Sequence, residues 1–232
     1  MAVLEDQPGL EVDVVVDGTT LTEFNSDEDE TTVNTITKYI VARSGTNFEV
    51  RCRFTTGRIF KKPNLAHETT TIMSGARYEE GGHFFLEKFA FSQLDITDND
   101  HTLDCKNLTQ TLSALGQLEI RVWWISVGRR GKNREKINVQ DIGKKALKGR
   151  AVSHNMSLQN REATKAFKTS NTTYLEKDPF ATFVFKYRST DALKALYIIP
   201  RSPTPVALEN RPIDVLTPEE MRASKTTTCI TK

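Results

Sequence analysis

Apolar and polar residues alternate between residues 181 and 188, and this alternation constrains the chain more than any other feature. Phe183, Phe185 and Tyr187 share one face, whereas Lys186 and Arg188 share the other. A two-residue period of this kind is typical of a strand with one buried face. The segment therefore predicts a scaffold strand in a β protein.

A short helix is predicted directly after this strand. Ser189 can accept a hydrogen bond from the first helical turn, and Asp191 lies where the helix dipole favours an anion. Leu193, Leu196 and Tyr197 would form an apolar stripe, and the helix is expected to end at Pro200.

Further segments show the same alternation or are rich in β-branched and aromatic residues. Strands are predicted over residues 10–16, 19–24, 35–42, 48–54, 83–91, 118–124 and 151–158. Many short strands with turns between them predict a mainly β fold, an antiparallel β-sandwich of jelly-roll or immunoglobulin-like type. Residues 1–203 would be one domain. Residues 204–232 would be a proline-punctuated linker with a short C-terminal helix that starts at Thr217.

Local signals refine this pattern. Asp17-Gly18 predicts a type I′ hairpin, and the alternation slips at Glu87-Lys88, which indicates a β-bulge or a turn onto the opposite face. Residues 55–80 are expected to form a long loop with one short strand near Ile72, and residues 128–136 a second loop. The pattern of residues 160–177 leaves a short helix and disorder both open.

Charge is unevenly distributed although the net charge is only +2. Residues 1–30 hold ten acidic side chains and no Lys or Arg, which leaves 32 basic against 20 acidic side chains in the rest. The acidic front and basic back would attract each other within one fold, or the back would meet an anionic partner.

The basic excess concentrates in residues 129–150, where nine Lys and Arg face two acids. Three interpretations stay open for this segment: a solvated loop paired with the acidic front, a nuclear import or nucleic-acid contact, and a contact to an acidic protein. The candidate residues are Arg129, Arg130, Lys132, Arg134, Lys136, Lys144, Lys145, Lys148 and Arg150.

Trp123 is the second candidate for a contact surface. If Trp124 packs inward with Val122, Trp123 faces outward beside Arg121. An outward tryptophan can stack on a base or a sugar, or insert into a partner, and cover by a loop is the alternative.

No catalytic residue, cofactor or metal site is predicted. The four histidines lack metal-binding spacing, and neither a nucleophile motif nor a dinucleotide turn is present. A cupin-like metal site would require His83 and His154 to converge from separate strands, and His154 is the histidine to test first. Cys52 alternates with core positions and is expected to be a buried small hydrophobe.

The cysteine count and the apolar runs bear on the compartment. Three cysteines without paired spacing suit a reducing environment, and no apolar run approaches a membrane span. The first residues also lack the features of a secretory signal. The predicted location is the cytoplasm or nucleus, with neither secretion nor a membrane partner.

Several blocks of the chain resemble an uncharacterised domain family that is widespread in fungal genomes. They are GLEVDVVVDGTTLTEFN, TKYIVARSGTNFEVRCRF, KALKGRAVSHNMSL, PFATFVFKYRSTDALKALYIIPRSPTPVALENRP and LTPEEMR. The resemblance implies a fungal, non-secreted β protein without a known activity.

Three functions follow as hypotheses. The first is a non-enzymatic intracellular module that binds a protein partner. The second is a nucleic-acid-binding or nuclear accessory protein that uses residues 129–150. The third is a cupin-like metal-dependent enzyme.

Overall fold

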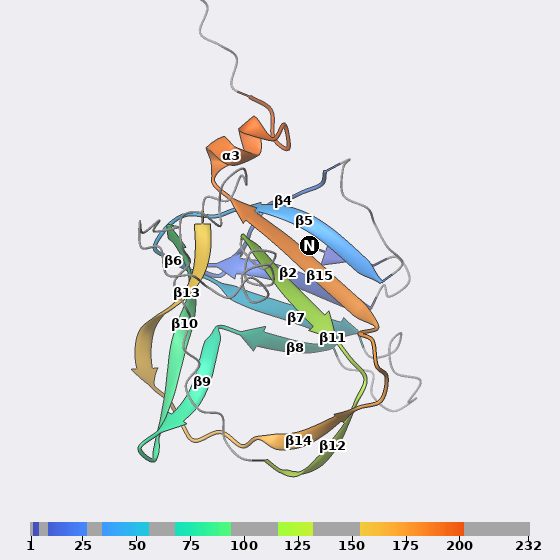
Figure 1. The fold of residues 1–232 in the computed structure, drawn as a ribbon, viewed down its shortest axis with the longest axis vertical. Helices are drawn as coiled ribbons and strands as arrows, with labels where there is room; N and C mark the ends of the chain where they lie inside the picture. Colours follow the sequence, from blue (N-terminus) through green and yellow to red (C-terminus); the bar gives the residue numbers. More distant parts are fainter. Residues whose placement is uncertain are drawn as a thin grey trace, which may run out of the picture. The chain divides into compact units, whose positions relative to one another are not determined.

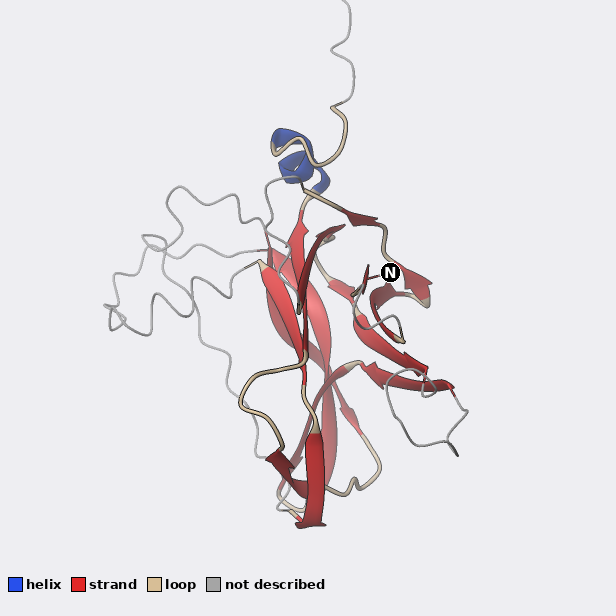
Figure 2. Cartoon of the chain, turned by 90° about the vertical axis from the view of Figure 1, so that its right-hand side faces the viewer, coloured by secondary structure: helices blue, strands red, loops and turns tan. Residues whose placement is uncertain are grey.

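The computed structural model describes residues 2–4, 9–26, 34–55, 68–93, 116–131 and 154–201. This part of the chain is mainly β, with one short helix among the described residues (Figures 1 and 2). The elements are β1 (Ala2–Val3), β2 (Leu10–Val16), β3 (Thr19–Thr20), β4 (Glu23–Phe24), β5 (Thr35–Val41), β6 (Thr46–Asn47), β7 (Glu49–Thr55), β8 (Glu68–Met73), β9 (Gly75–Glu80), β10 (His83–Gln93), β11 (Gln117–Val122), β12 (Ile125–Arg130), β13 (His154–Ala163), β14 (Ser170–Tyr174), β15 (Ala181–Arg188) and α3 (Thr190–Ala195).

The strands form three larger sheets and one two-stranded ribbon. Sheet I has the order β1-β2-β7-β8 with β3 paired to β2, and sheet II has the order β13-β10-β6 with β9 paired to β10. Sheet III has the order β11-β15-β5-β4, and β12 pairs with β14 alone. The predicted mainly β fold is confirmed. No sheet closes on itself within the described strands, and this strand order does not by itself establish a β-sandwich.

The chain divides into two compact units, residues 1–199 and 200–232. All the strands and α3 belong to the first unit. The predicted linker and C-terminal helix of residues 204–232 lie outside the described residues. The predicted single domain over residues 1–203 therefore stays a prediction.

Sheet III is organised around β15, which lies between β11 and β5 in Figure 1. Phe183, Phe185 and Tyr187 are all buried, as their alternation predicts. The pairing of β15 with β11 is antiparallel, whereas its pairing with β5 is parallel from Thr182↔Thr35 to Arg188↔Val41. This parallel pair departs from the purely antiparallel prediction. Parallel neighbours need a long connection, and here residues 42–180 form the connection between β5 and β15.

One hydrophobic core connects the three larger sheets. Its buried residues include Val12 of sheet I, Phe91 of sheet II and Phe183 of sheet III. The aromatic rings are in direct contact, with the centroids of Phe48 and Phe91 4.3 Å apart and those of Phe91 and Tyr187 5.3 Å apart. Stacked and tilted rings at these distances attract each other beyond the burial of their area.

The two sequence signals for turns and bulges are confirmed. Asp17 and Gly18 have φ values of 49° and 77°, as a two-residue type I′ loop requires. The pairing of β10 with β13 shifts register between Leu86 and Lys88. At this bulge Glu87 is buried and accepts a hydrogen bond of 2.9 Å from the Tyr78 hydroxyl. The extra residue of the bulge lies on β13, where Asn160, with a left-handed φ of 54°, and Arg161 stand opposite Glu87.

Three segments contain more strand than predicted. The short strand expected near Ile72 is confirmed by β8, but β9 also lies within residues 55–80; residues 160–177 were left open between helix and disorder and instead contain the end of β13 and all of β14. The predicted loop 128–136 begins inside β12, while its part beyond Gly131 lies outside the described residues. The described positions of β8, β12 and β14 are exposed on both faces. Because no face is buried there, selection for alternating apolar residues is absent.

Helix α3 begins as predicted but ends earlier. The Ser189 side chain accepts a hydrogen bond of 3.2 Å from the Ala192 N–H, and Leu193 is buried. The predicted stripe is wrong for Leu196 and Tyr197, which are exposed. The helix ends before Pro200 because Tyr197 adopts a left-handed φ of 57°.

The turn after α3 is a complete Schellman motif. The Tyr197 N–H bonds to the Lys194 carbonyl at 3.2 Å, and the Ile198 N–H bonds to the Leu193 carbonyl at 3.0 Å. Glycine usually occupies the left-handed position of this motif, since a side chain there meets the following carbonyl. Tyrosine therefore carries a conformational cost at this position.

Replacing Tyr197 by Gly and, separately, by Ala tests this cost. Both changes remove the same side-chain contacts, but only Gly relieves the left-handed backbone. We expect Tyr197→Gly to be about 1 kcal/mol more stable than Tyr197→Ala, measured by urea denaturation. Equal stabilities of the two variants would show that the turn carries no such cost.

Candidate functional site

Every residue of the ribbon formed by β12 and β14 is exposed, and the ribbon lies at the opposite end of the first unit from α3 in Figure 1. Its register pairs Ile125 with Tyr174 and Val127 with Thr172. Paired residues lie on the same face, so Ile125, Val127 and Tyr174 form one apolar face. Their exposed fractions are 46%, 65% and 61%. We call these three side chains the ribbon face.

Two of the nine predicted basic residues belong to the ribbon. The register shifts between Val127 and Arg130, where Arg130 pairs with Ser170. Ser170 lies two positions from Thr172, so Arg130 lies on the ribbon face beside Val127. Arg129 is exposed within the bulge. The other seven lie outside the described residues: Lys132, Arg134, Lys136, Lys144, Lys145, Lys148 and Arg150.

Trp123 and Trp124 lie where the chain passes from sheet III to the ribbon. The predicted strand 118–124 ends at Val122, because β11 pairs with β15 whereas β12 pairs with β14. Trp123 is half-buried, with its ring 5.3 Å from the Tyr174 ring, so it adjoins the ribbon face. Trp124 stacks on Phe180 at 4.4 Å. Both indole rings therefore contact another aromatic side chain of the protein, and Trp123 is not the fully exposed tryptophan that an outward position would give.

His154 is buried and does not converge with His83. The two residues lie at opposite ends of β10, because His154 pairs with Gln93 and His83 begins the strand. Ten residues at roughly 3.3 Å each place them about 30 Å apart. The convergence of these two histidines that the cupin-like hypothesis requires is therefore not found. No group of three or more metal-binding side chains occurs within the described ranges.

His154 instead stabilises the turn after β5. Its Nε2 lies 3.1 Å from Ser44 Oγ, across 110 residues of sequence. Burial lowers the pKa of this imidazole below its ordinary value, because the charged form loses hydration. At neutral pH the ring is therefore neutral, and it forms one half of a contact that joins β13 to the β5–β6 turn.

Part of the acidic front pairs within sheet I. The buried carboxylate of Asp13 receives Arg51 and Arg53 at 2.9 Å each, and Glu11 pairs with Arg53 at 2.9 Å. These arginines belong to β7, the neighbour of β2. Removing one partner of such a buried group is strongly destabilising, so these charges serve the fold.

The prediction for Cys52 is confirmed. The side chain is buried in the core of sheet I and is a free thiol. Burial and the nearby charge of Asp13 raise its pKa to about 11. Since the thiolate is the reactive form, Cys52 is chemically inert at neutral pH.

The ribbon face was missed by the sequence interpretation. Ile125 and Val127 alternate with Ser126 and Gly128, but residues 125–127 lie between the predicted strand 118–124 and the predicted loop 128–136 and belong to neither. The continued alternation after the tryptophan pair was the available signal.

No helix of the described residues combines the length and apolar character that a membrane span requires.

Replacing His154 by Gln tests its buried neutral state. The pKa of His154 is lowered in the folded protein, so between that pKa and 6.5 the unfolded chain binds more protons. This contribution to the free energy of unfolding is complete above pH 6.5 and is lost as the pH falls. We expect His154→Gln to flatten the decline in stability between about pH 7.5 and about pH 5.5, measured by urea denaturation.

His83→Gln is the matched control, since His83 is exposed. The free energy of unfolding of His83→Gln should decline with falling pH as much as that of the unaltered protein. A decline that persists in His154→Gln, or vanishes in His83→Gln, would contradict the assignment.

Comparison with known proteins identifies a family. A model described as a domain of unknown function, DUF7918, matches residues 9–67 and 54–202, most of the chain. Searches of curated proteins and of solved structures each gave no significant match. The resemblance to an uncharacterised domain family is thereby confirmed, while the fungal source stays a prediction. The chain belongs to the DUF7918 family, a domain of unknown function.

Proposed function

We propose that this protein is a non-enzymatic interaction module that binds another protein through the ribbon face. The observation that carries the proposal is the exposure of Ile125, Val127 and Tyr174 on one side of β12 and β14. A two-stranded ribbon is marginally stable alone. Its apolar side chains are exposed to water, so their burial by a partner would lower the free energy of the complex. Clustered exposed apolar residues mark such contacts.

The partner is an acidic protein segment. Arg130 lies on the ribbon face and Arg129 beside it, at the start of the stretch in which nine basic residues face two acidic ones. Complementary charge at the rim of an apolar contact speeds association and selects against basic partners. The half-buried Trp123 next to Tyr174 enlarges the apolar area with a residue type that is enriched at binding hot spots.

The non-enzymatic part of the proposal is supported by the way the reactive side chains are used. Cys52 is buried with a raised pKa, and His154 bonds to Ser44 in a structural contact. Asp13 is paired with two arginines inside sheet I. The environment of each of these side chains is explained by its contribution to the stability of the fold, and a catalytic role is not needed to explain it.

Nucleic acid is the second candidate partner. The major groove of DNA admits a two-stranded β-ribbon, and exposed Arg129 and Arg130 lie on such a ribbon. Binding of this kind would weaken steeply with salt. The apolar ribbon face favours the protein partner, because Ile125 and Val127 have no complement along a phosphate backbone.

The finer fold and the compartment belong to the same proposal. A β-sandwich of jelly-roll or immunoglobulin-like type is supported by the single core that sheets I, II and III share. A cytoplasmic or nuclear location is supported by the odd number of cysteines and by the free thiol of Cys52. A fungal source rests on the resemblance of the sequence blocks alone.

A photoreactive residue on the ribbon face tests the function. A diazirine amino acid at position 127, irradiated in extracts of the native cells, should form a covalent adduct with one protein. We expect the adducted peptide to be rich in Asp and Glu. The adduct should be lost at high salt and in Arg129→Glu/Arg130→Glu, because rim charges steer association.

Position 173 provides the control. Thr173 is exposed on the opposite face of the same ribbon, paired with Ser126. The same residue placed there should give no such adduct. Equal adducts at both positions, or none at either, would contradict the proposal. A salt-sensitive nucleic-acid adduct at position 127 would establish the second candidate instead.

A further inference from the structure

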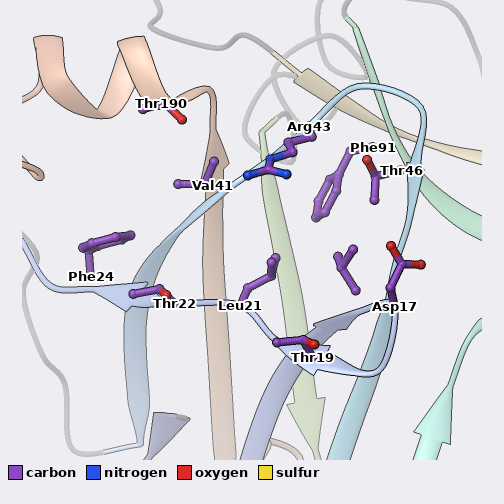
Figure 3. A pocket seen from close by; sticks show the side chains of 11 residues that line it. Asp17, Thr19, Leu21, Thr22, Phe24, Val41, Arg43, Thr46, Phe91 and Thr190 are labelled. Carbon is purple, nitrogen blue, oxygen red and sulfur yellow. The ribbon is translucent and has the colours of Figure 1, made fainter.

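A pocket of about 470 Å³ lies where the ends of the three larger sheets meet. It is formed by the β2–β3 hairpin, the segment 21–24, the end of β5 with the turn that follows, β10 and the first residue of α3 (Figure 3). Pockets for small molecules typically measure about 300–1,000 Å³. The ribbon lies at the other end of the unit, so this pocket is independent of the ribbon face.

The inner wall of the pocket is apolar. Phe91 is buried in the aromatic core and presents its ring to the pocket, and Leu21 and Val41 are half-buried beside it. An apolar group that enters would leave water and contact an aromatic ring. The wall therefore selects a ligand with an apolar body.

The rim carries one charge of each sign among the described lining residues. The Arg43 side chain is exposed, and it makes no hydrogen bond or ion pair within the described part of the chain, while its carbonyl accepts a bond of 3.3 Å from the Thr46 N–H. Asp17 is exposed at the tip of the β2–β3 hairpin. In Figure 3 the Phe91 ring lies between the side chains of Arg43 and Asp17. The hydroxyls of Thr22 and Thr46 supply further polar contacts.

We propose that this pocket binds a small organic anion with an apolar body and a single carboxylate. The planar guanidinium of Arg43 matches a carboxylate with two parallel hydrogen bonds. Asp17 on the far side opposes a second negative charge, so a monoanion binds better than a dianion such as phosphate. The apolar body lies against Phe91, Leu21 and Val41.

Three related probes test the ligand class by NMR titration of the full chain. They are 4-phenylbutyrate, its neutral amide 4-phenylbutanamide, and phenyl phosphate. We expect 4-phenylbutyrate to bind in the millimolar range or tighter, and about tenfold more tightly than the amide, because a paired guanidinium and carboxylate at an exposed rim is partly screened by water. Phenyl phosphate should bind more weakly than 4-phenylbutyrate. Shifted amide signals should include Leu21, Val41 and Thr46.

Variants assign the effect to Arg43 and Asp17. Arg43→Gln should bring the acid-to-amide ratio to about one, whereas Arg77→Gln, an exposed arginine on β9, should leave it unchanged. Asp17→Asn keeps a residue that suits the type I′ turn and should strengthen phenyl phosphate binding. The proposal is overturned by an unchanged ratio in Arg43→Gln, by shifts confined to the ribbon, or by no millimolar binding.

Discussion

The contact of Phe91 with Phe48 and Tyr187 is the interaction on which the rest of the described structure depends. Phe91 belongs to sheet II and Tyr187 to sheet III, while Phe48 joins β6 of sheet II to β7 of sheet I. The three sheets share no strand pairing, so the contacts between these side chains connect them in addition to the chain links and the backbone bonds at the junctions, such as that from the Phe48 N–H to the Phe89 carbonyl at 3.0 Å. Since the three rings are buried, their removal from water is the main force that holds the sheets against one another. The same Phe91 ring supplies the wall of the pocket, so the pocket depends on this contact as well.

The ribbon stands outside this system. Each position of β12 and β14 is exposed, and neither strand contributes a residue to the shared core. Its chain is attached at the ends, through Trp124 stacked on Phe180 and the Leu175 N–H bonded to the Trp124 carbonyl at 2.9 Å. A surface built in this way can change its side chains without disturbing the core. The charged groups of sheet I differ, because Asp13, Arg51 and Arg53 are tied into the fold itself.

Sequence patterns predict the elements that bury one face, and they fail where no face is buried. Residues 10–16, the Asp17-Gly18 turn and the Glu87 bulge follow from alternation and turn chemistry. Strands β8 and β14 are stabilised by pairing to a neighbour and have no apolar alternation in their sequence, whereas β12 alternates only from Ile125 to Gly128. The partner of His154 and the pocket rim depend on which strands become neighbours, since Ser44 and His154 are 110 residues apart. Seven of the nine predicted basic residues lie outside the described residues, so that prediction is untested there.

The ribbon face is proposed to serve a partner, whereas the aromatic contact of Phe91 stabilises the fold. The most direct measurement compares the free energy of unfolding of Ile125→Thr/Val127→Thr with that of Phe91→Ala. Threonine keeps the β-branched shape of both ribbon positions. We expect a loss of less than about 1 kcal/mol for the ribbon variant, as is usual for exposed sites, and of about 3–5 kcal/mol for Phe91→Ala. A ribbon variant as destabilised as Phe91→Ala would contradict this expectation, because the ribbon face would then be part of the core.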